Sequence, residues 1–533
     1  MTEPNNKYYR FDLSVMQINR LVNFQLIMIV AIGVLFVALP FILPTIDWED
    51  YSITFNGTWL MYNGYEPYKD FGIPTGLGSF LMPYLSFVLF GPNYNSLYIM
   101  QGIEHVLLMY LTYQLFKALF EDKIIQKLAT GFTILTLAFF VTLNTKAQFY
   151  NTEFLIYEIG ALAWLMKAIN ATEQKSKIIH AVITALFVFL CAQVKQDYGL
   201  FCLLITTTVF IFYSIVQRTY IQLWVFVSSL TLFILIFLSI IDTERFFYWF
   251  NLGNGDRLKQ SVLTKIMKNI LQGDFLKILL LIVLDIGLRV YGYIKQPHQR
   301  SLLYFIPTLL FCGLGLQNIV TLSTSNFPYL FYAATFLIAS ILVQGYALLK
   351  HKTFAFMSVN IIVILFLYNN AGQVYKSIFY FYPKGILMTT KETDQTNFKV
   401  AGVNRNYKEN SGDFKYCQLL LDSLYKAKKA PLTMVNFTDL PLEMEVPSQR
   451  INGLPLWPDN NVLLFDNEKK RYLELVNQQQ FDVIFILELE FEGSYFTNHD
   501  FKNAVLNQCQ FIKTFPIAKY DNKRHISIFI RKQ

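Results

Sequence analysis

The sequence has few charged residues for its length. Only 82 of its 533 residues are Lys, Arg, Asp or Glu, which is 15%, whereas soluble domains carry about a quarter. This shortage excludes an ordinary soluble enzyme, because 54% of the chain is hydrophobic and one aqueous core cannot hide that much apolar surface. The net charge of +8 is small for this length and gives no reason to expect a nucleic-acid partner.

Several familiar signatures are also absent. No His/Cys spacing typical of a metal site stands out, and neither does a phosphate-binding Gly loop, an internal repeat or a low-complexity tract. Cysteine is scarce, with five in the chain. Cys417 and Cys509 lie in the polar C-terminal part, where an oxidising compartment would permit a disulfide and two unpaired thiols are equally compatible with the sequence.

Long apolar runs are what the sequence has instead. A helix needs about 20 mostly apolar residues to cross the hydrocarbon core of a bilayer, and it satisfies its backbone hydrogen bonds internally. The sequence therefore predicts a polytopic α-helical membrane protein with about eleven transmembrane helices. We expect the spans at 24–46, 94–116, 128–145, 152–166, 178–194, 199–216, 221–241, 275–293, 301–321, 327–349 and 354–370.

The distribution of Lys and Arg predicts the orientation. The first run is too long for a signal-peptide core and lacks a small-residue cleavage site, so we expect an uncleaved anchor with a cytoplasmic N-terminus. The cytoplasmic loops then carry 14 Lys and Arg in 60 residues, and the opposite loops carry 8 in 95. Residues 73–91 are also apolar, but Pro and Gly interrupt them. We expect a re-entrant or interfacial helix there, within a first outer loop of residues 47–93.

Charge also divides the chain into two regions. Residues 1–371 hold 43 of the charges (12%), and residues 372–533 hold 39 (24%). An odd number of spans from an inside start places the second region outside, so we predict an extracytoplasmic C-terminal domain on a cell (inner) membrane protein. An amphipathic stretch at 416–428 precedes short apolar runs, which indicates an α/β domain. The expected strands are 432–437, 462–465, 483–487 and 526–530.

The first outer loop opens on clustered carboxylates. Asp47, Glu49 and Asp50 follow the first span directly. Carboxylates this close repel one another, which raises the pKa of at least one and favours proton transfer or cation binding. A solvated helix end is the alternative interpretation. The loop continues with Tyr51, then Gly64-Tyr65-Glu66-Pro67-Tyr68-Lys69-Asp70-Phe71, then Pro74-Thr75-Gly76.

These motifs resemble the membrane glycosyltransferases of the GT-C class, especially bacterial relatives of protein mannosyltransferases and of the aminoarabinose transferase that modifies lipid A (glycosyltransferase families 39 and 83). Such enzymes carry an acidic pair and a Tyr after the first span, then a Gly-x-x-Pro-Tyr-x-Asp-Phe-like stretch and a Pro/Gly-rich juxtamembrane helix. The resemblance implies a GT-C-like transmembrane domain. It also implies transfer of a hexosyl or pentosyl group from a polyprenyl-phosphate donor to a cell-envelope lipid, glycan or protein on the extracytoplasmic face.

The resemblance also implies roles for residues of this loop. A carboxylate at the membrane surface can take the proton of the attacking acceptor, which makes Asp47 or Asp50 the candidate base and Glu49 a second or positioning carboxylate. No metal is required, although the three carboxylates could hold a divalent cation through oxygen ligands. The candidate substrate-binding residues of the loop are Tyr51, Tyr68, Lys69 and Asp70.

A lipid-phosphate leaving group needs cations at headgroup level. Lys195 is the only positive charge in a very short outer turn, and the resemblance implies that it neutralises the donor phosphate with Gln196 as a hydrogen-bond donor. The alternative is a Lys that snorkels to the interface. Glu153, at the start of a predicted span, could contact sugar hydroxyls or simply complement a helix N-terminus.

A further outer loop follows residue 241. An aromatic run at 246–250 predicts an interfacial belt, and Arg257 to Leu271 has the spacing of an amphipathic helix on the outer leaflet. Its role is anchoring or lipid-phosphate contact, with Arg245, Arg257 and Lys259 as the candidate residues.

Charged residues inside the predicted spans must find partners, because an unpaired charge in the membrane is costly. Glu104, His105 and Glu158 are of this kind. Asp285 and Arg289, four residues apart, predict a structural ion pair on a helix surface.

A transporter or flippase of a lipid-linked precursor is the main alternative function. Transporters place polar residues at the bilayer midplane and show repeated halves, whereas this chain gathers its carboxylates and cations on one face. A non-catalytic envelope scaffold is a third class, since fold resemblance does not prove activity.

The predicted topology can be tested by cysteine labelling. A single cysteine replacing Arg450 should react with a membrane-impermeant maleimide from outside, and one replacing Thr172 should react only from the cytoplasm. Labelling of residue 450 from the cytoplasmic side would contradict the span count.

Overall fold

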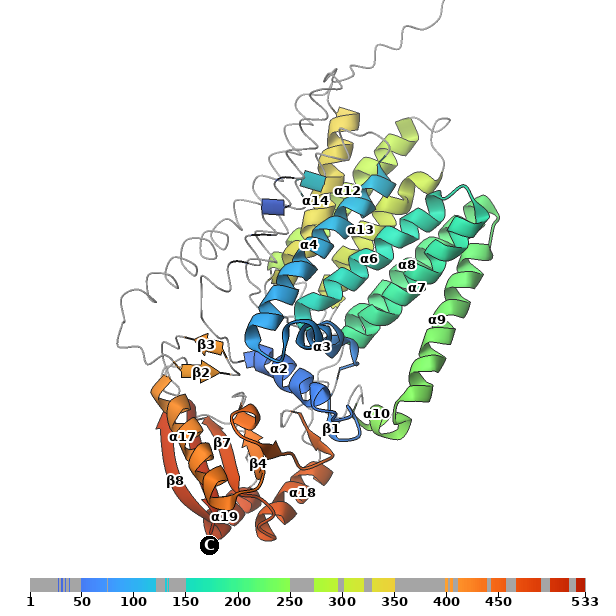
Figure 1. Ribbon diagram of the computed structural model, residues 1–533. Coiled ribbons are helices and arrows are strands. Elements are labelled where there is room, and N and C mark those ends of the chain that lie inside the picture. The colour runs from blue at the N-terminus through green and yellow to red at the C-terminus, as the bar shows by residue number, and fades with distance from the viewer. Residues whose placement is uncertain are drawn as a thin grey trace, which may run out of the picture.

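A computed structural model gives the architecture of the chain. It consists of a bundle of long helices with a mixed α/β sheet domain at one end (Figure 1). The structure describes residues 49–73, 75–120, 150–249, 273–295, 302–320, 328–349, 398–400, 403–405, 411–438, 442–456, 466–489, 499–516 and 524–532, with isolated positions between 27 and 38 and between 130 and 133.

The bundle is built from the long apolar runs. Each run has enough consecutive apolar residues to form a helix that exposes apolar side chains around much of its circumference. Three described helices, α7, α8 and α9, are long and apolar enough to cross a membrane. The bundle helices are α4 (Tyr94–Leu119), α6 (Tyr150–Asn170), α7 (Gln174–Val194), α8 (Gln196–Gln217), α9 (Ile221–Ile240), α12 (Gly273–Lys295), α13 (Ile306–Val320), preceded by the 3-10 turn η4 (Leu302–Phe305), and α14 (Pro328–Leu349).

These helices coincide with eight of the eleven predicted spans. The predicted spans 24–46, 128–145 and 354–370 lie outside the described residues, apart from isolated positions. The total of eleven therefore stays a prediction, as does the side of the membrane that each loop faces.

The interrupted apolar stretch of the first outer loop forms a short helix. Helix α3 (Gly78–Phe90) has 13 residues and Pro83 inside it. At 1.5 Å per residue its length is about 20 Å, which is less than the roughly 30 Å of a hydrocarbon core. The length agrees with the predicted non-spanning helix. Gly91, with φ of +86°, ends α3, and the side chain of Asn93 caps α4 by accepting from the Ser96 amide at 3.1 Å.

The C-terminal region contains a five-stranded sheet of order β5-β4-β7-β9-β8. Strands β5, β4 and β7 are parallel, whereas β9 runs antiparallel to β7 and β8. Its strands are β4 (Leu432–Phe437), β5 (Ser448–Gln449), β7 (Val483–Leu489), β8 (Cys509–Pro516) and β9 (Arg524–Arg531).

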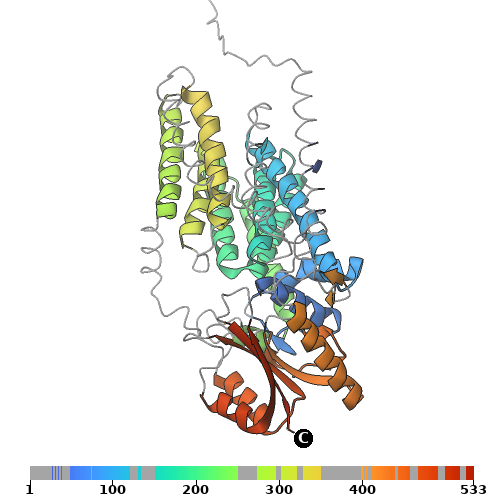
Figure 2. The ribbon, with the colours of Figure 1, turned by 90° about the vertical axis from the view of Figure 1, so that its left-hand side faces the viewer.

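Helices cover both faces of this sheet (Figure 2). Alternate residues of β4 and β7 point to opposite faces, as the pleat requires. One face packs against α17 (Ser411–Lys428), and the other packs against α18 (Asp466–Asn477) and α19 (His499–Gln508). The strands expected at 432–437, 483–487 and 526–530 are present, whereas 462–465 lies outside the described residues. The boundary between 371 and 372 also lies outside the described residues.

The two cysteines of this region are not bonded. Neither Cys417 nor Cys509 forms a disulfide, and both are buried. Cys417 belongs to the core on the α17 side of the sheet, and Cys509 belongs to the core on the α19 side. The sheet separates them, so of the two alternatives left by the sequence the structure shows two thiols without a disulfide between them.

The predicted structural pair of Asp285 and Arg289 lies inside the helix bundle. Both side chains are buried between α12, η4, α13 and α14. The Asp285 carboxylate accepts hydrogen bonds from Thr308 (2.9 Å), Ser340 (2.6 Å) and Gln344 (3.0 Å). Arg289 donates to the Tyr304 carbonyl oxygen at 2.9 Å and to Ser340 at 3.3 Å. The i,i+4 spacing was recognised correctly, but the partners come from other helices, which the sequence does not place.

Removal of the buried carboxylate should destabilise the helix bundle. We expect Asp285→Ala to lower the free energy of unfolding by about 3–5 kcal/mol, because it leaves Arg289 as an uncompensated buried charge. Asp285→Asn keeps one acceptor oxygen and should be milder. Thermal unfolding in detergent measures both. Equal stability of Asp285→Ala and the wild type would show that the network contributes nothing.

Candidate functional site

The predicted catalytic carboxylates lie where a helix begins. Glu49 and Asp50 are the first two residues of α2 (Glu49–Tyr62), and Tyr51 follows in the same turn. A helix N-terminus attracts negative charge, because its first backbone N–H groups point outward without partners in the helix. Asp47 lies outside the described residues. The backbone of α2 therefore carries Glu49 and Asp50 together at its start.

A tight loop connects α2 to α3. Its centre is Tyr68, which has a φ of +68°, a value that is unusual for a bulky residue. The ring is fully buried and packs in a T-shaped arrangement with the Phe246 ring, with 5.0 Å between the ring centroids. The Tyr68 hydroxyl donates to the Thr75 carbonyl oxygen at 2.8 Å. Burial raises the pKa of Tyr68, so the hydroxyl keeps the proton that it donates. In this structure Tyr68 holds the loop together, and direct contact with substrate stays a prediction.

The neighbouring predicted residues stabilise the same loop or lie on its surface. The Asp70 carboxylate accepts a hydrogen bond from the Glu66 amide at 2.8 Å, which closes the turn. The Lys69 ammonium pairs with Glu66 at 2.9 Å on an exposed surface, and this pairing raises the pKa of Lys69. Exposed pairs of this kind are weak, so Lys69 is available to exchange Glu66 for another anion.

Lys195 forms the junction between two bundle helices. It has extended backbone angles between the end of α7 and the start of α8. Its side chain is only 7% exposed, and its ammonium lies 4.8 Å from the Tyr198 ring and 5.8 Å from the Phe154 ring. Aromatic faces stabilise a cation that has lost water. Gln196 opens α8 and is half-buried beside it.

Two buried carboxylates lie close to this turn. Glu153, in the first turn of α6, is 1% exposed, and neither of its carboxylate oxygens has a hydrogen-bond partner among the described residues. The ring of the next residue, Phe154, packs against the Tyr198 ring, with 3.9 Å between the ring centroids. Glu104 of the adjacent helix α4 is also buried and close enough to Glu153 for their charges to repel. Buried polar groups are normally hydrogen-bonded, so the Glu153 carboxylate suits a ligand that supplies donors.

Sequence reasoning did not find this grouping. Glu104 was recognised as a buried charge that needs partners, but it was not placed beside Glu153. Tyr157, one turn after Glu153, was missed, and its hydroxyl likewise has no hydrogen-bond partner within the described ranges. The i,i+4 spacing of Glu153 and Tyr157 was the available signal, since it puts both on one face of a helix.

The start of α3 is packed directly on the Lys195 turn. The Ser79 hydroxyl donates to the Val194 carbonyl oxygen at 3.1 Å. A Cβ atom added at Gly76 would lie 2.3 Å from the Gln193 carbonyl oxygen, and one at Gly78 would lie 2.9 Å from the Gln193 carbonyl carbon. Only glycine permits this approach of one backbone to another. The part of the first outer loop that runs from the start of α2 to the start of α3 therefore ends against residues 193 and 194, next to Lys195.

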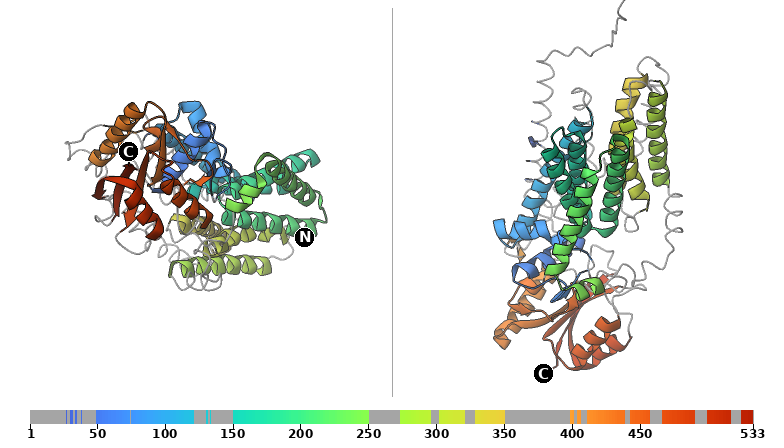
Figure 3. Two further views of the ribbon diagram at one scale, coloured as in Figure 1. Left: turned by 90° about the horizontal axis from the view of Figure 1, so that it is seen from below. Right: turned by 90° about the vertical axis from the view of Figure 1, so that its right-hand side faces the viewer.

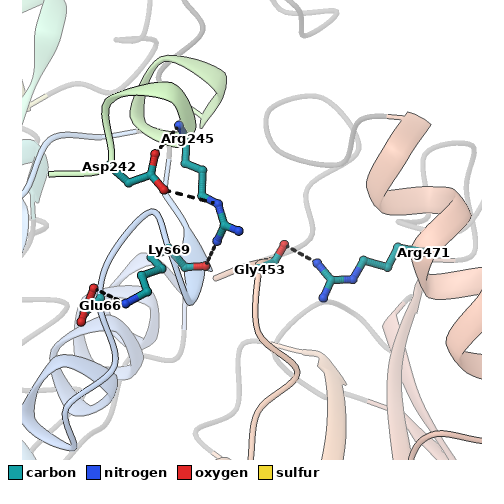
Figure 4. A network of polar contacts seen from close by, with 6 residues as sticks. All are labelled: Glu66, Lys69, Asp242, Arg245, Gly453 and Arg471. Atoms are coloured by element: carbon teal, nitrogen blue, oxygen red, sulfur yellow. Dashed lines mark hydrogen bonds and ion pairs between the residues drawn. The ribbon is translucent and has the colours of Figure 1, made fainter.

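A second outer segment completes the surroundings of the loop. Helix α10 (Thr243–Trp249) follows α9, and Arg245 on it bonds to Asp242 at 3.5 Å and donates to the Lys69 carbonyl oxygen (Figure 4). In the described part of the predicted aromatic belt, Phe246 and Trp249 are buried against the loop, Tyr248 is partly buried and Phe247 is exposed, whereas Phe250 lies outside the described residues. Arg257 and Lys259 lie outside the described residues.

Of the predicted site residues, the structure joins Arg245 to the loop of Tyr68 to Asp70, and it places Phe154, the neighbour of Glu153, against Tyr198 of the Lys195 turn. The start of α2 is not among the residues that these contacts bring together. Among the residues that the structure describes, no group of three or more His, Cys, Asp or Glu side chains could hold a metal ion.

The sequence matches no protein-family model and no curated protein. Its structure resembles that of ArnT from Cupriavidus metallidurans. The ArnT structure bound to undecaprenyl phosphate is 11% identical in sequence and matches over 95% of this chain and 97% of that chain with a TM-score of 0.51. The apo ArnT structure is 10% identical and matches over 96% and 98%, also with a TM-score of 0.51.

ArnT, a lipid A aminoarabinose transferase, is a GT-C enzyme. This chain has a GT-C fold. The resemblance noted from the motifs of the first loop is therefore confirmed at the level of the fold. Together with its long apolar helices, the GT-C fold makes this a membrane protein. The oligosaccharyltransferase of Archaeoglobus fulgidus with zinc and sulfate is 12% identical over 86% of this chain and 67% of that chain, but its TM-score of 0.45 is too low to carry an argument about this chain.

The close approach at Gly76 yields a sharp prediction. Gly76→Ala should lower the free energy of unfolding by about 1–3 kcal/mol, because the added methyl must push the loop away from the backbone of residue 193. Gly287→Ala on α12 is the matched control, since nothing lies within 4 Å of its added Cβ. It should be neutral or stabilising by up to about 1 kcal/mol. Thermal unfolding in detergent compares them, and equal stability of Gly76→Ala and the wild type would refute the packing.

Proposed function

We propose that the protein is a membrane glycosyltransferase that moves one sugar from a polyprenyl-phosphate donor to a cell-envelope acceptor on the extracytoplasmic face. One observation carries this proposal. The loop that starts at Glu49 and Asp50 ends in contact with the turn of Lys195, beside the buried Glu153. The proposed base and the proposed cation are thus linked by one segment of the chain, in a fold shared with ArnT, which was crystallised with undecaprenyl phosphate.

The reaction assigns a task to each group. An acceptor hydroxyl or amine attacks the anomeric carbon, and a new bond forms there as the bond from that carbon to the phosphate oxygen breaks. The bonding electrons leave with the polyprenyl phosphate, and the acceptor proton passes to a carboxylate. Asp47 or Asp50 is proposed as this base, with Glu49 as the second carboxylate.

The leaving phosphate gains negative charge as the bond breaks. Lys195 is proposed to stabilise that charge, because a buried cation acts more strongly there than in water. Gln196 at the start of α8 would add a donor, and an anion near a helix N-terminus is favoured. Further candidates for contact with the lipid phosphate are Arg245, Arg257 and Lys259. Arg245 would make this contact while it stays bonded to Asp242 and to the Lys69 carbonyl oxygen.

Glu153 is proposed to bind the donor sugar. A carboxylate accepts hydrogen bonds from sugar hydroxyls, and Glu153 has two such oxygens without partners among the described residues. Glu104 and Tyr157 extend this polar surface. A divalent cation at the α2 carboxylates is compatible with the proposal, which does not require it.

Transfer of radiolabel tests the function. Membranes containing the wild type are incubated with a panel of polyprenyl-phosphate sugars, and label is followed into envelope lipid, glycan and protein. We expect Asp47→Asn or Asp50→Asn to reduce turnover by roughly 10²- to 10⁴-fold, the usual contribution of a general base. Glu153→Gln should mainly raise the KM for the donor. The control is Glu244→Gln, an exposed acidic residue of α10.

Two outcomes would change the interpretation. No transfer from any donor by correctly folded protein would favour the transporter or flippase. Activity lost with EDTA and restored by Mg²⁺ or Mn²⁺ would place a cation in the mechanism.

A further inference from the structure

The first outer loop is bound by the C-terminal domain. Strand β1 (Phe71–Gly72) pairs in parallel with β6 (Leu454–Pro455). Two further backbone bonds extend the pairing, from the Gly453 amide to the Asp70 carbonyl oxygen (2.7 Å) and from the Leu456 amide to the Gly72 carbonyl oxygen (2.8 Å). A two-residue strand pair is marginal by itself, so its stability must come from what surrounds it.

Helix α18 holds the C-terminal side of this pairing. The Arg471 guanidinium donates to the Gly453 carbonyl oxygen at 3.1 Å (Figure 4). It also donates to the Asn452 carbonyl oxygen. Gly453 itself has a φ of +72°, which favours glycine. Arg471 therefore fixes the turn whose next residues pair with the first loop.

The same helix also holds α10. The Tyr248 hydroxyl donates to the Glu468 carboxylate, 2.7 Å and 2.9 Å from its two oxygens. Glu468 is buried, and hydrogen bonds to an ionised acceptor are stronger than neutral ones. Burial and the charge of Glu468 raise the pKa of Tyr248, so the hydroxyl stays protonated and can donate.

Helix α10 also packs against the first outer loop. The ring of Trp249 lies against Gly72, where an added Cβ would be 2.4 Å from the ring. Arg245 donates to the Lys69 carbonyl oxygen. Glu468 and Arg471 are three residues apart and so lie on one face of α18. One face of α18 therefore contacts both segments that hold the loop, the turn at Gly453 and helix α10. These contacts lie at the end of the bundle where Figure 3 shows the C-terminal domain.

The segment held in this way connects the proposed catalytic groups. Its N-terminal end follows α2, which starts at Glu49 and Asp50, and its C-terminal end packs on the Lys195 turn. A shift of the segment would therefore disturb its packing on the Lys195 turn and the C-terminal end of α2, the helix that carries the proposed carboxylates at its start. Misplacement by about 1 Å can reduce a rate by about 10²-fold.

We propose that α18 of the C-terminal domain is a positioning element for glycosyl transfer: through Glu468 and Arg471 it fixes the first outer loop, and so the distance between the α2 carboxylates and Lys195. This inference rests on the proposed function and gives the C-terminal domain a task in it. Glu468, Arg471 and Tyr248 act through the loop and need not touch substrate.

Variants of the Tyr248–Glu468 pair test the proposal in the full chain. Tyr248→Phe removes the donor, Glu468→Ala removes the acceptor, and Glu468→Gln keeps one acceptor oxygen. We expect Tyr248→Phe and Glu468→Ala each to lower kcat by about tenfold per folded molecule with little change in the KM for the donor. Glu468→Gln should recover part of the loss, and the double variant should be no worse than either single variant, because both remove one interaction.

Matched controls separate this effect from general damage. Glu474→Gln changes an exposed carboxylate of the same helix, and Tyr220→Phe changes an exposed tyrosine. Both should leave kcat unchanged. Hydrogen–deuterium exchange supplies a readout that does not need activity: the amides of residues 66–72 and 452–456 should exchange faster in Tyr248→Phe and Glu468→Ala than in the wild type and the controls.

The outcomes distinguish this inference from the proposed function. Unchanged exchange at residues 66–72 would overturn it, because α18 would then not hold the loop. Faster exchange with unchanged kcat would also overturn it, because loop position would not limit transfer. If the wild type transfers no sugar while the exchange differences appear, the proposed function fails but the mechanical link between α18 and the loop stands.

Discussion

The approach of Gly76 and Gly78 to the backbone of residues 193 and 194 is the contact on which the site depends. It joins a loop that starts at carboxylates to the turn that carries Lys195, and it does so through backbone atoms, which leave little room for adjustment. Ser79 adds a hydrogen bond across the same contact. The position of this segment on the Lys195 turn is therefore fixed by packing rather than by attraction between charges.

Two buried polar groupings in the bundle differ in a way that indicates their roles. The Asp285 carboxylate accepts three hydrogen bonds from neighbouring helices, so it is satisfied within the fold and serves to join α12, α13 and α14. Glu153, by contrast, is just as buried but has no hydrogen-bond partner among the described residues. A satisfied network needs no ligand, whereas a buried carboxylate beside Lys195 is suited to a substrate that brings hydroxyl donors.

The C-terminal sheet domain contributes to the site without lining it. Its helix α18 reaches the first loop through the turn at Gly453 and reaches α10 through Glu468. In the proposed function this loop follows the helix that carries the base, and a loop loses conformational freedom when it is ordered. Contacts from a rigid domain supply that order in advance, which is the basis of preorganised catalysis.

The helical membrane class, the position of eight described bundle helices and three of the strands were predictable from local patterns, because apolar length and periodicity are local properties. The same patterns singled out the first loop, Glu153 and Lys195 as candidates. Folding in three dimensions was needed to show that Glu104 lies by Glu153, that Asp285 is buried among three helices, that Tyr68 supports the loop from within, and that β6 pairs with β1. Each of these depends on which distant segments meet, and that depends on packing between helices and strands, about which a local pattern carries no information.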